Sequence, residues 1–87
     1  FMTYQVIIPK PVEKQLENLS QNLNERILEK ILSLVEDPRP SGVKKLKSFK
    51  NEYRIRVGDY RVRYEIDDEN LTVIVLHCSH RKDVYKK

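Results

Sequence analysis

The chain has 87 residues, of which 39% are hydrophobic and 34% are charged, and its formal net charge is +4. This length suits one small hydrophobic core, so we expect a single domain over residues 2–87, and no apolar run is long enough to cross a bilayer. The start of the chain lacks the features of a signal peptide, so we expect a cytoplasmic protein that does not contact a membrane.

The first half of the chain predicts one strand and two helices. Residues 3–8 are rich in β-forming side chains and predict a short strand. Pro11 suits the first turn of a helix, and a second helix is expected to begin at Asn22, because Asn22 with Glu25 resembles a capping box. The short connection predicts an antiparallel pair of helices. The apolar stripe of the second helix, which must be buried, is Leu23, Ile27, Leu28, Ile31, Leu34 and Val35.

The second half changes to the patterns of strands. Residues 43–47 read as a short basic strand, and residues 53–66 read as a β-hairpin whose turn is Gly58-Asp59. An acidic turn follows at residues 67–70, away from any expected RNA. Residues 71–76 are nearly all apolar, as in a strand covered on both faces. The fold class is therefore α+β, with two N-terminal antiparallel helices on one face of a mainly antiparallel four- to five-stranded sheet in the order β-α-α-β-β-β-β.

The hairpin carries four arginines on one side. With a two-residue turn, Val57 pairs with Tyr60, so Arg56 lies opposite Arg61 and Arg54 lies opposite Arg63. We call this side of the sheet, which carries Arg54, Arg56, Arg61 and Arg63, the arginine face. Like charges directly opposite one another destabilise a hairpin, so a fold that keeps them is expected to bind an anion there, and the geometry suggests phosphate.

The charges are divided unevenly along the chain. Residues 12–37 hold six acidic and three basic side chains, whereas residues 43–63 hold eight basic and two acidic ones. Such a basic pole attracts polyanions. A solvated sheet edge guarded by lysines is the alternative interpretation. One cysteine and two histidines do not make a metal site, so we expect neither a metal nor another cofactor.

The end of the chain adds another basic segment. It follows the apolar strand directly, so His80 and Arg81 are expected at a strand end beside the hairpin arginines. Tyr85 is an aromatic residue among cations, a combination that suits stacking on a base and pairing with phosphates. The alternative is a frayed basic terminus without a role.

These motifs in combination resemble the RelE/ParE toxin superfamily, on its RelE side. The resemblance covers the whole chain and rests on residues 46–47, 53–64 and 75–85. It implies a toxin that enters the ribosomal A site and cuts messenger RNA without a metal, by attack of a ribose 2′-hydroxyl on the adjacent phosphate. It also implies a cognate antitoxin that wraps around the toxin and holds its activity off.

The resemblance assigns the family's site to particular residues here. Its two basic residues on the first hairpin strand fall on Arg54 and Arg56, and its second-strand arginine falls on Arg61, which can hold the phosphate bidentately. Its late arginine falls on Arg81, expected to act on the leaving 5′ oxygen, and its tyrosine falls on Tyr85, expected to stack on the base or ribose. Further RNA-binding residues are expected to be Lys44, Lys45, Lys47, Arg63 and Lys82.

One departure bears on the general base. Strongly cleaving RelE toxins often carry lysines where this chain has Arg54 and Arg56, and arginine effectively cannot give up its proton. His80 is then the nearest candidate base, with a turn residue of no catalytic role as the alternative. Two other functions stay open: a ParE-like inhibitor of DNA gyrase, and a RelE-fold protein that binds RNA or the ribosome with weak or lost cleavage.

Overall fold

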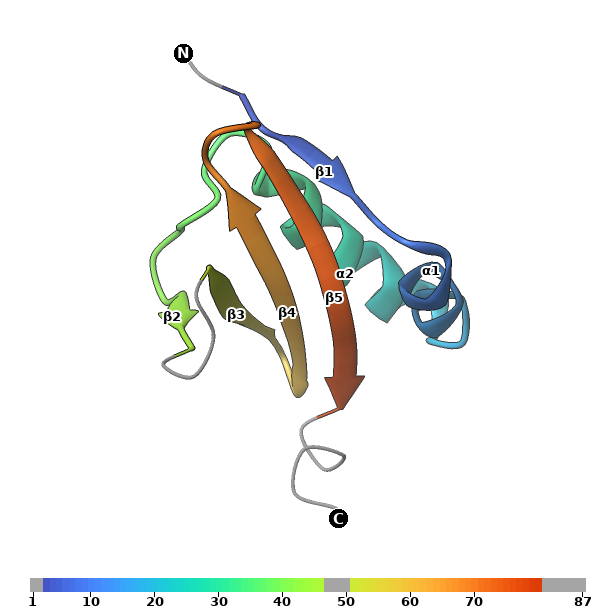
Figure 1. Ribbon diagram of the computed structural model, residues 1–87. Helices are drawn as coiled ribbons and strands as arrows, with labels where there is room; N and C mark the ends of the chain where they lie inside the picture. The colour runs from blue at the N-terminus through green and yellow to red at the C-terminus, as the bar shows by residue number, and fades with distance from the viewer. Residues whose placement is uncertain (1–2, 47–50, 81–87) are drawn as a thin grey trace.

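A computed structural model describes residues 3–46 and 51–80 of the chain, and Figure 1 shows two helices on one side of a twisted sheet. Within these residues the elements are β1 (Gln5–Ile7), α1 (Lys10–Glu17), α2 (Gln21–Ser33), β2 (Lys44–Lys45), β3 (Glu52–Val57), β4 (Tyr60–Asp67) and β5 (Thr72–His80). None of the described helices is long and apolar enough to cross a membrane.

The sheet has the strand order β1-β5-β4-β3-β2, with β1 parallel to β5 and every other neighbouring pair antiparallel. This confirms the predicted α+β class with two helices on a mainly antiparallel sheet. The hairpin register is also as predicted, because Val57 pairs with Tyr60 and the next pairs follow in step. Gly58 adopts a φ of 61° in the turn, a conformation that glycine enters without the Cβ clash of other residues.

The core lies between the helices and the inner face of the sheet. Ile27, Ile31 and Leu34 of the α2 stripe have 0% exposure. They belong to one cluster with the alternate hairpin residues that the sequence predicted to meet them, namely Tyr53, Ile55, Val57, Val62, Tyr64 and Ile66. Burial of this many apolar side chains is the main favourable term for the fold. It also fixes which side of β3 and β4 the arginines occupy.

Several predicted boundaries were wrong. The first strand is Gln5–Ile7 rather than residues 3–8, and the apolar strand is Thr72–His80 rather than residues 71–76. The helix α2 begins at Gln21 rather than at Asn22, because the side chain of Ser20 accepts a hydrogen bond from the Leu23 N–H at 3.3 Å and so acts as the N-cap. The basic strand predicted over residues 43–47 begins at Lys44, and the Leu46 N–H still donates to the Glu52 carbonyl of β3 at 2.9 Å, whereas Lys47 lies outside the described residues.

The strand β5 contains a bulge that the sequence did not predict. Arg63 of β4 pairs with His77, whereas the next residue, Tyr64, pairs with Val75, so Leu76 has no partner of its own. One extra residue reverses the alternation of side chains beyond it. Val73 and Val75 are buried before the bulge, and Cys78 is buried after it.

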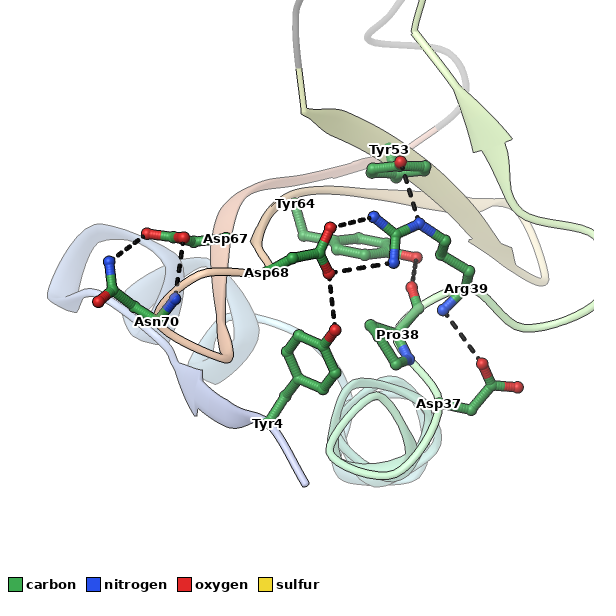
Figure 2. Close-up of polar contacts among 9 residues, drawn as sticks. All are labelled: Tyr4, Asp37, Pro38, Arg39, Tyr53, Tyr64, Asp67, Asp68 and Asn70. Carbon is green, nitrogen blue, oxygen red and sulfur yellow. Dashed lines mark hydrogen bonds and ion pairs between the residues drawn. The ribbon is translucent and has the colours of Figure 1, made fainter. Parts of the chain in front are cut away.

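Arg39 joins three separate parts of the chain at one end of the sheet (Figure 2). Its guanidinium donates to both carboxylate oxygens of Asp68, at 3.3 and 2.9 Å, and its Nε donates to the Tyr53 hydroxyl at 3.1 Å. The Tyr4 hydroxyl donates to the same carboxylate at 2.6 Å. Nearby, the buried Tyr64 hydroxyl donates to the Pro38 carbonyl at 2.7 Å. The segment after α2 is thereby tied to the β4–β5 turn and to the start of β1.

We expect Asp68→Asn to change how stability depends on pH. The hydrogen bonds from Arg39 and then Tyr4 lower the pKa of Asp68 in the fold. A carboxylate with a lowered pKa stabilises the fold above its unfolded pKa of about 3.9, and this contribution is lost as the pH falls through the folded value. The melting temperature of wild type should therefore be higher than that of Asp68→Asn at neutral pH, and the difference should disappear below about pH 4.

Glu69→Gln is the control, because Glu69 is an exposed acid of the same turn. It should keep the wild-type pH dependence. A difference in melting temperature between wild type and Asp68→Asn that stays the same in strong acid would contradict the role of the ionised carboxylate.

Candidate nucleic-acid interface

Two rows of side chains cross the sheet on the arginine face. The first row takes one residue from each of β2, β3, β4 and β5: Lys44, Arg54, Arg63 and His77. The second row takes one residue from each of β3, β4 and β5: Arg56, Arg61 and Ser79. Neighbours along a row stand about 5 Å apart by ordinary cross-strand geometry. The sheet therefore presents a compact cationic surface on the side away from the helices.

The four arginines differ in their exposure. Arg56 and Arg63 are exposed, whereas Arg54 and Arg61 are half-buried. A half-buried arginine packs its aliphatic stem while it keeps a planar fork of donors for an oxyanion. The arrangement is suited to phosphate, because guanidinium and phosphate form paired hydrogen bonds.

Arg63 has a carboxylate partner within this surface. Its Nη2 lies 3.0 Å from Oε1 of Glu52, whose side chain is only 11% exposed. Glu52 shares its side of β3 with Arg54 and Arg56, since side chains alternate along a strand. This buried acid offsets part of the repulsion among the arginines and holds Arg63 in position.

We expect Glu52→Gln to steepen the salt dependence of RNA binding. The substitution removes the charge that neutralises Arg63, so one more cation becomes available to a phosphate. For single strands, each neutralised phosphate adds about 0.7 to the slope of log K against log salt, so the slope should grow by about that amount. Fluorescence anisotropy with a labelled RNA oligonucleotide between about 50 and 200 mM salt measures it.

Glu13→Gln provides the matched control, because it makes the same charge change on exposed α1, across the sheet from the arginine face. Its slope should equal that of wild type. Identical slopes for wild type and Glu52→Gln would show that Arg63 already contacts RNA in spite of the ion pair.

The strand register places the predicted site residues on different sides of the sheet. Lys44 pairs with Arg54 and lies on the arginine face, but Lys45 pairs with Tyr53 and so lies on the helix side of β2. His80 pairs with Tyr60, and the two rings meet edge to face at 5.1 Å, which puts His80 on the helix side as well. The remaining predicted residues lie outside the described residues: Lys47, Arg81, Lys82 and Tyr85.

The acidic turn is at the far end of β4. Asp67 ends that strand, whereas the Gly58-Asp59 turn precedes its first residue, Tyr60. The side chain and backbone N–H of Asn70 donate to Asp67, and these hydrogen bonds lower the pKa of its carboxyl. The Asp67 carboxylate is thus held ionised at the end of β4 away from the arginine pair nearest the hairpin turn.

Several basic groups near this surface were not found from the sequence. A groove of about 490 Å³ between α2 and the hairpin turn is lined by Arg26 and Lys30 together with Arg56 and the acidic Glu29. The Arg26 guanidinium lies about 4 Å from where a Cβ on Gly58 would be. Arg26 and Lys30 both belong to residues 12–37, whose net charge is negative, so the charge pattern did not point to them. The sequence also did not point to Ser79 and His77, because the bulge in β5 moves their side chains from the helix side of the sheet to the arginine face.

The described residues contain no group of three or more His, Cys, Asp or Glu side chains that could hold a metal ion. Cys78 is also unsuited to nucleophilic chemistry. Its burial raises the pKa of the thiol to about 11, so it stays protonated at neutral pH. Its backbone N–H donates to Oε1 of Gln15 at 3.0 Å, which ties β5 to α1 at this point.

The model of the family described as "ParE toxin of type II toxin-antitoxin system, parDE" matches residues 6–85. The chain belongs to the RelE/ParE toxin superfamily. Among curated relatives, this RelE/ParE chain is 35% identical over 54 residues to Toxin RelG of Mycobacterium tuberculosis, an alignment that covers 62% of each chain. It is 44% identical to Toxin RelE3 of Methanocaldococcus jannaschii over 49% of this chain and 47% of that one. With Putative toxin RelE1 of the same archaeon, the identity is 32% over 98% of both chains.

Solved structures agree with this assignment. The RelE-RelB complex from Pyrococcus horikoshii matches with a TM-score of 0.82 and 35% identity, over 92% of this chain and 97% of that one. The RelBE2 toxin-antitoxin complex from Mycobacterium tuberculosis matches with a TM-score of 0.78 and 28% identity, over 91% and 99%. The predicted superfamily is therefore confirmed.

Proposed function

We propose that this RelE/ParE chain is the toxin of a toxin-antitoxin pair and cleaves messenger RNA in the ribosomal A site. The observation that carries the proposal is the pair of cationic rows on the arginine face, which offers several guanidinium groups to consecutive phosphates of one strand. The toxin part of the proposal is supported by the curated relatives Toxin RelG and Toxin RelE3. The ribosome would present the message in a fixed geometry, which lowers the entropy cost of reaction.

In this proposal the protein acts by charge stabilisation and needs no metal. The ribose 2′-hydroxyl attacks the adjacent phosphorus, and Arg61 holds the phosphate oxygens on which negative charge develops. Arg54 and Arg56 neutralise the neighbouring backbone. Arg81 and Tyr85, which lie outside the described residues, stay as predictions for the leaving 5′ oxygen and for stacking on the base or ribose.

The test is primer-extension mapping in a translation extract. Added protein should produce cuts at codon spacing in translated messages and none in the same RNA without ribosomes. Intact messages at saturating protein would refute the nuclease proposal.

A cognate antitoxin is proposed as the partner. The Pyrococcus horikoshii structure contains RelB with its RelE, and this chain covers 97% of that toxin. An acidic segment that folds as it docks would suit so basic a domain. We propose that it lies across the helices and neutralises the basic end of the chain. Ribosome binding by the purified complex equal to that of the toxin alone would contradict this mode of inhibition.

Inhibition of DNA gyrase is the second candidate, and the ParE description of the matching family model favours it. A gyrase supercoiling assay separates the two. Loss of supercoiling with intact messages would establish the ParE-like function. Tight, salt-sensitive ribosome binding without either effect would indicate a RelE fold that has lost cleavage, as the arginines in place of lysines allow.

A further inference from the structure

The bulge at Leu76 decides which of the two histidines lies on the arginine face, because His77 and His80 are three positions apart and so lie on opposite sides of β5. Without it, His77 would continue the buried series of Val73 and Val75, because alternate residues of a strand share a side. With it, His77 pairs with Arg63 on the arginine face and is exposed, whereas His80 pairs with Tyr60.

Two observations support this assignment independently of the register. Cys78, which lies between the histidines, is 6% exposed and belongs to the core cluster between the helices and the sheet. The His80 ring meets the Tyr60 ring edge to face, and Tyr60 packs against the core. His77 must therefore point away from the helices.

The surroundings of His77 are those of the proposed RNA site. In its row lie Arg63, Arg54 and Lys44, from β4, β3 and β2 in turn. The adjacent charged groups on this face are Glu52 on β3 and Arg61 and Glu65 on β4. On its other side, β1 (Gln5–Ile7) contributes no charged side chain. An imidazole exchanges its proton near neutral pH, whereas the guanidiniums around it effectively do not.

We propose that His77 is a further catalytic residue of this site and accepts the proton of the attacking 2′-hydroxyl. This inference rests on the proposed nuclease function. The 2′ oxygen forms a bond to phosphorus with its own electron pair and passes its proton to the imidazole. The bond from phosphorus to the 5′ oxygen breaks, and the departing oxygen keeps that electron pair and takes a proton from water. The products are a 2′,3′-cyclic phosphate and a free 5′-hydroxyl.

The test compares His77→Gln with His80→Gln on ribosomes stalled with a message in the A site. Single-turnover cleavage rates are measured from about pH 5.5 to 8.5, a range that brackets the titration of imidazole. Wild type should show a rate that rises through one inflection near neutral pH. His77→Gln should lose that inflection and be slower by about 10² or more, the usual contribution of a general base.

His80→Gln should keep the inflection, since its side chain faces the helix layer. Addition of free imidazole to His77→Ala should restore part of the lost rate. Circular dichroism must show wild-type folding for each variant, which is expected at the exposed position 77.

The outcomes separate the two proposals. Wild-type protein that releases no fragments overturns the nuclease function and the role of His77 together. Wild-type protein that cuts, with His77→Gln retaining the rate and the inflection, overturns only the role of His77. If His80→Gln loses the inflection instead, His80 is the base, and this result also overturns the role of His77.

Discussion

Arg61→Ala is expected to lower the rate of ribosome-dependent cleavage by about 10² to 10³, the usual cost of removing one donor to a developing oxyanion. Arg61 lies between Arg56 and Ser79 in the second row of the arginine face, on the strand that takes the middle place among the five. Its guanidinium can hold two phosphate oxygens at once, which alanine cannot do. Primer extension at saturating toxin measures the loss.

Lys14→Ala is the control for this prediction. Lys14 is an exposed residue of α1 and its loss removes the same charge from the other side of the sheet. It should keep the wild-type rate to within a few-fold, while both variants keep the circular dichroism of the folded protein. Equal losses for the two variants would mean that overall charge, rather than the phosphate contact, governs the rate.

Ile31→Ala is expected to lower the free energy of unfolding by about 2–5 kcal/mol. Ile31 of α2 is 0% exposed and packs in the cluster that joins the helices to the sheet. Truncation removes buried apolar surface and leaves a cavity, and small domains have only a narrow margin of stability to lose. Urea unfolding followed by circular dichroism measures the change.

The next residue supplies the control. Leu32 follows Ile31 on the same helix but is 57% exposed, so Leu32→Ala should stay within about 0.5 kcal/mol of wild type. A comparable loss for both variants would contradict the observed orientation of α2. If Ile31→Ala does not fold at all, Ile31→Val should still show a loss of about 0.5–1.5 kcal/mol.

Much of this fold is encoded over short distances in the sequence. The alternation of residues 53–64 with a two-residue turn was enough to predict the pairing of Arg56 with Arg61 and of Arg54 with Arg63, and the register confirms it. The stripe on α2 predicted the helix and its buried side. Both predictions succeed because each depends on residues within a few positions of one another, whose geometry local sterics and burial determine.

The predicted start of α2 failed because two local signals competed. Asn22 with Glu25 had the spacing of a capping box, but Ser20 caps the helix instead. Ser and Asn are nearly equal as N-caps, so sequence pattern alone does not choose between them.

What only the tertiary structure decided depends on residues far apart. The bulge at Leu76 appears in the pairing of β5 with β4, and no residue pattern within β5 announces it. Arg39 finds Asp68, 29 positions later, only after the sheet has brought the two segments together. The sequence by itself thus determined the arginine face and the helices that cover the other side. The fold decided which histidine shares that face, because strand register is set by the packing of the whole core.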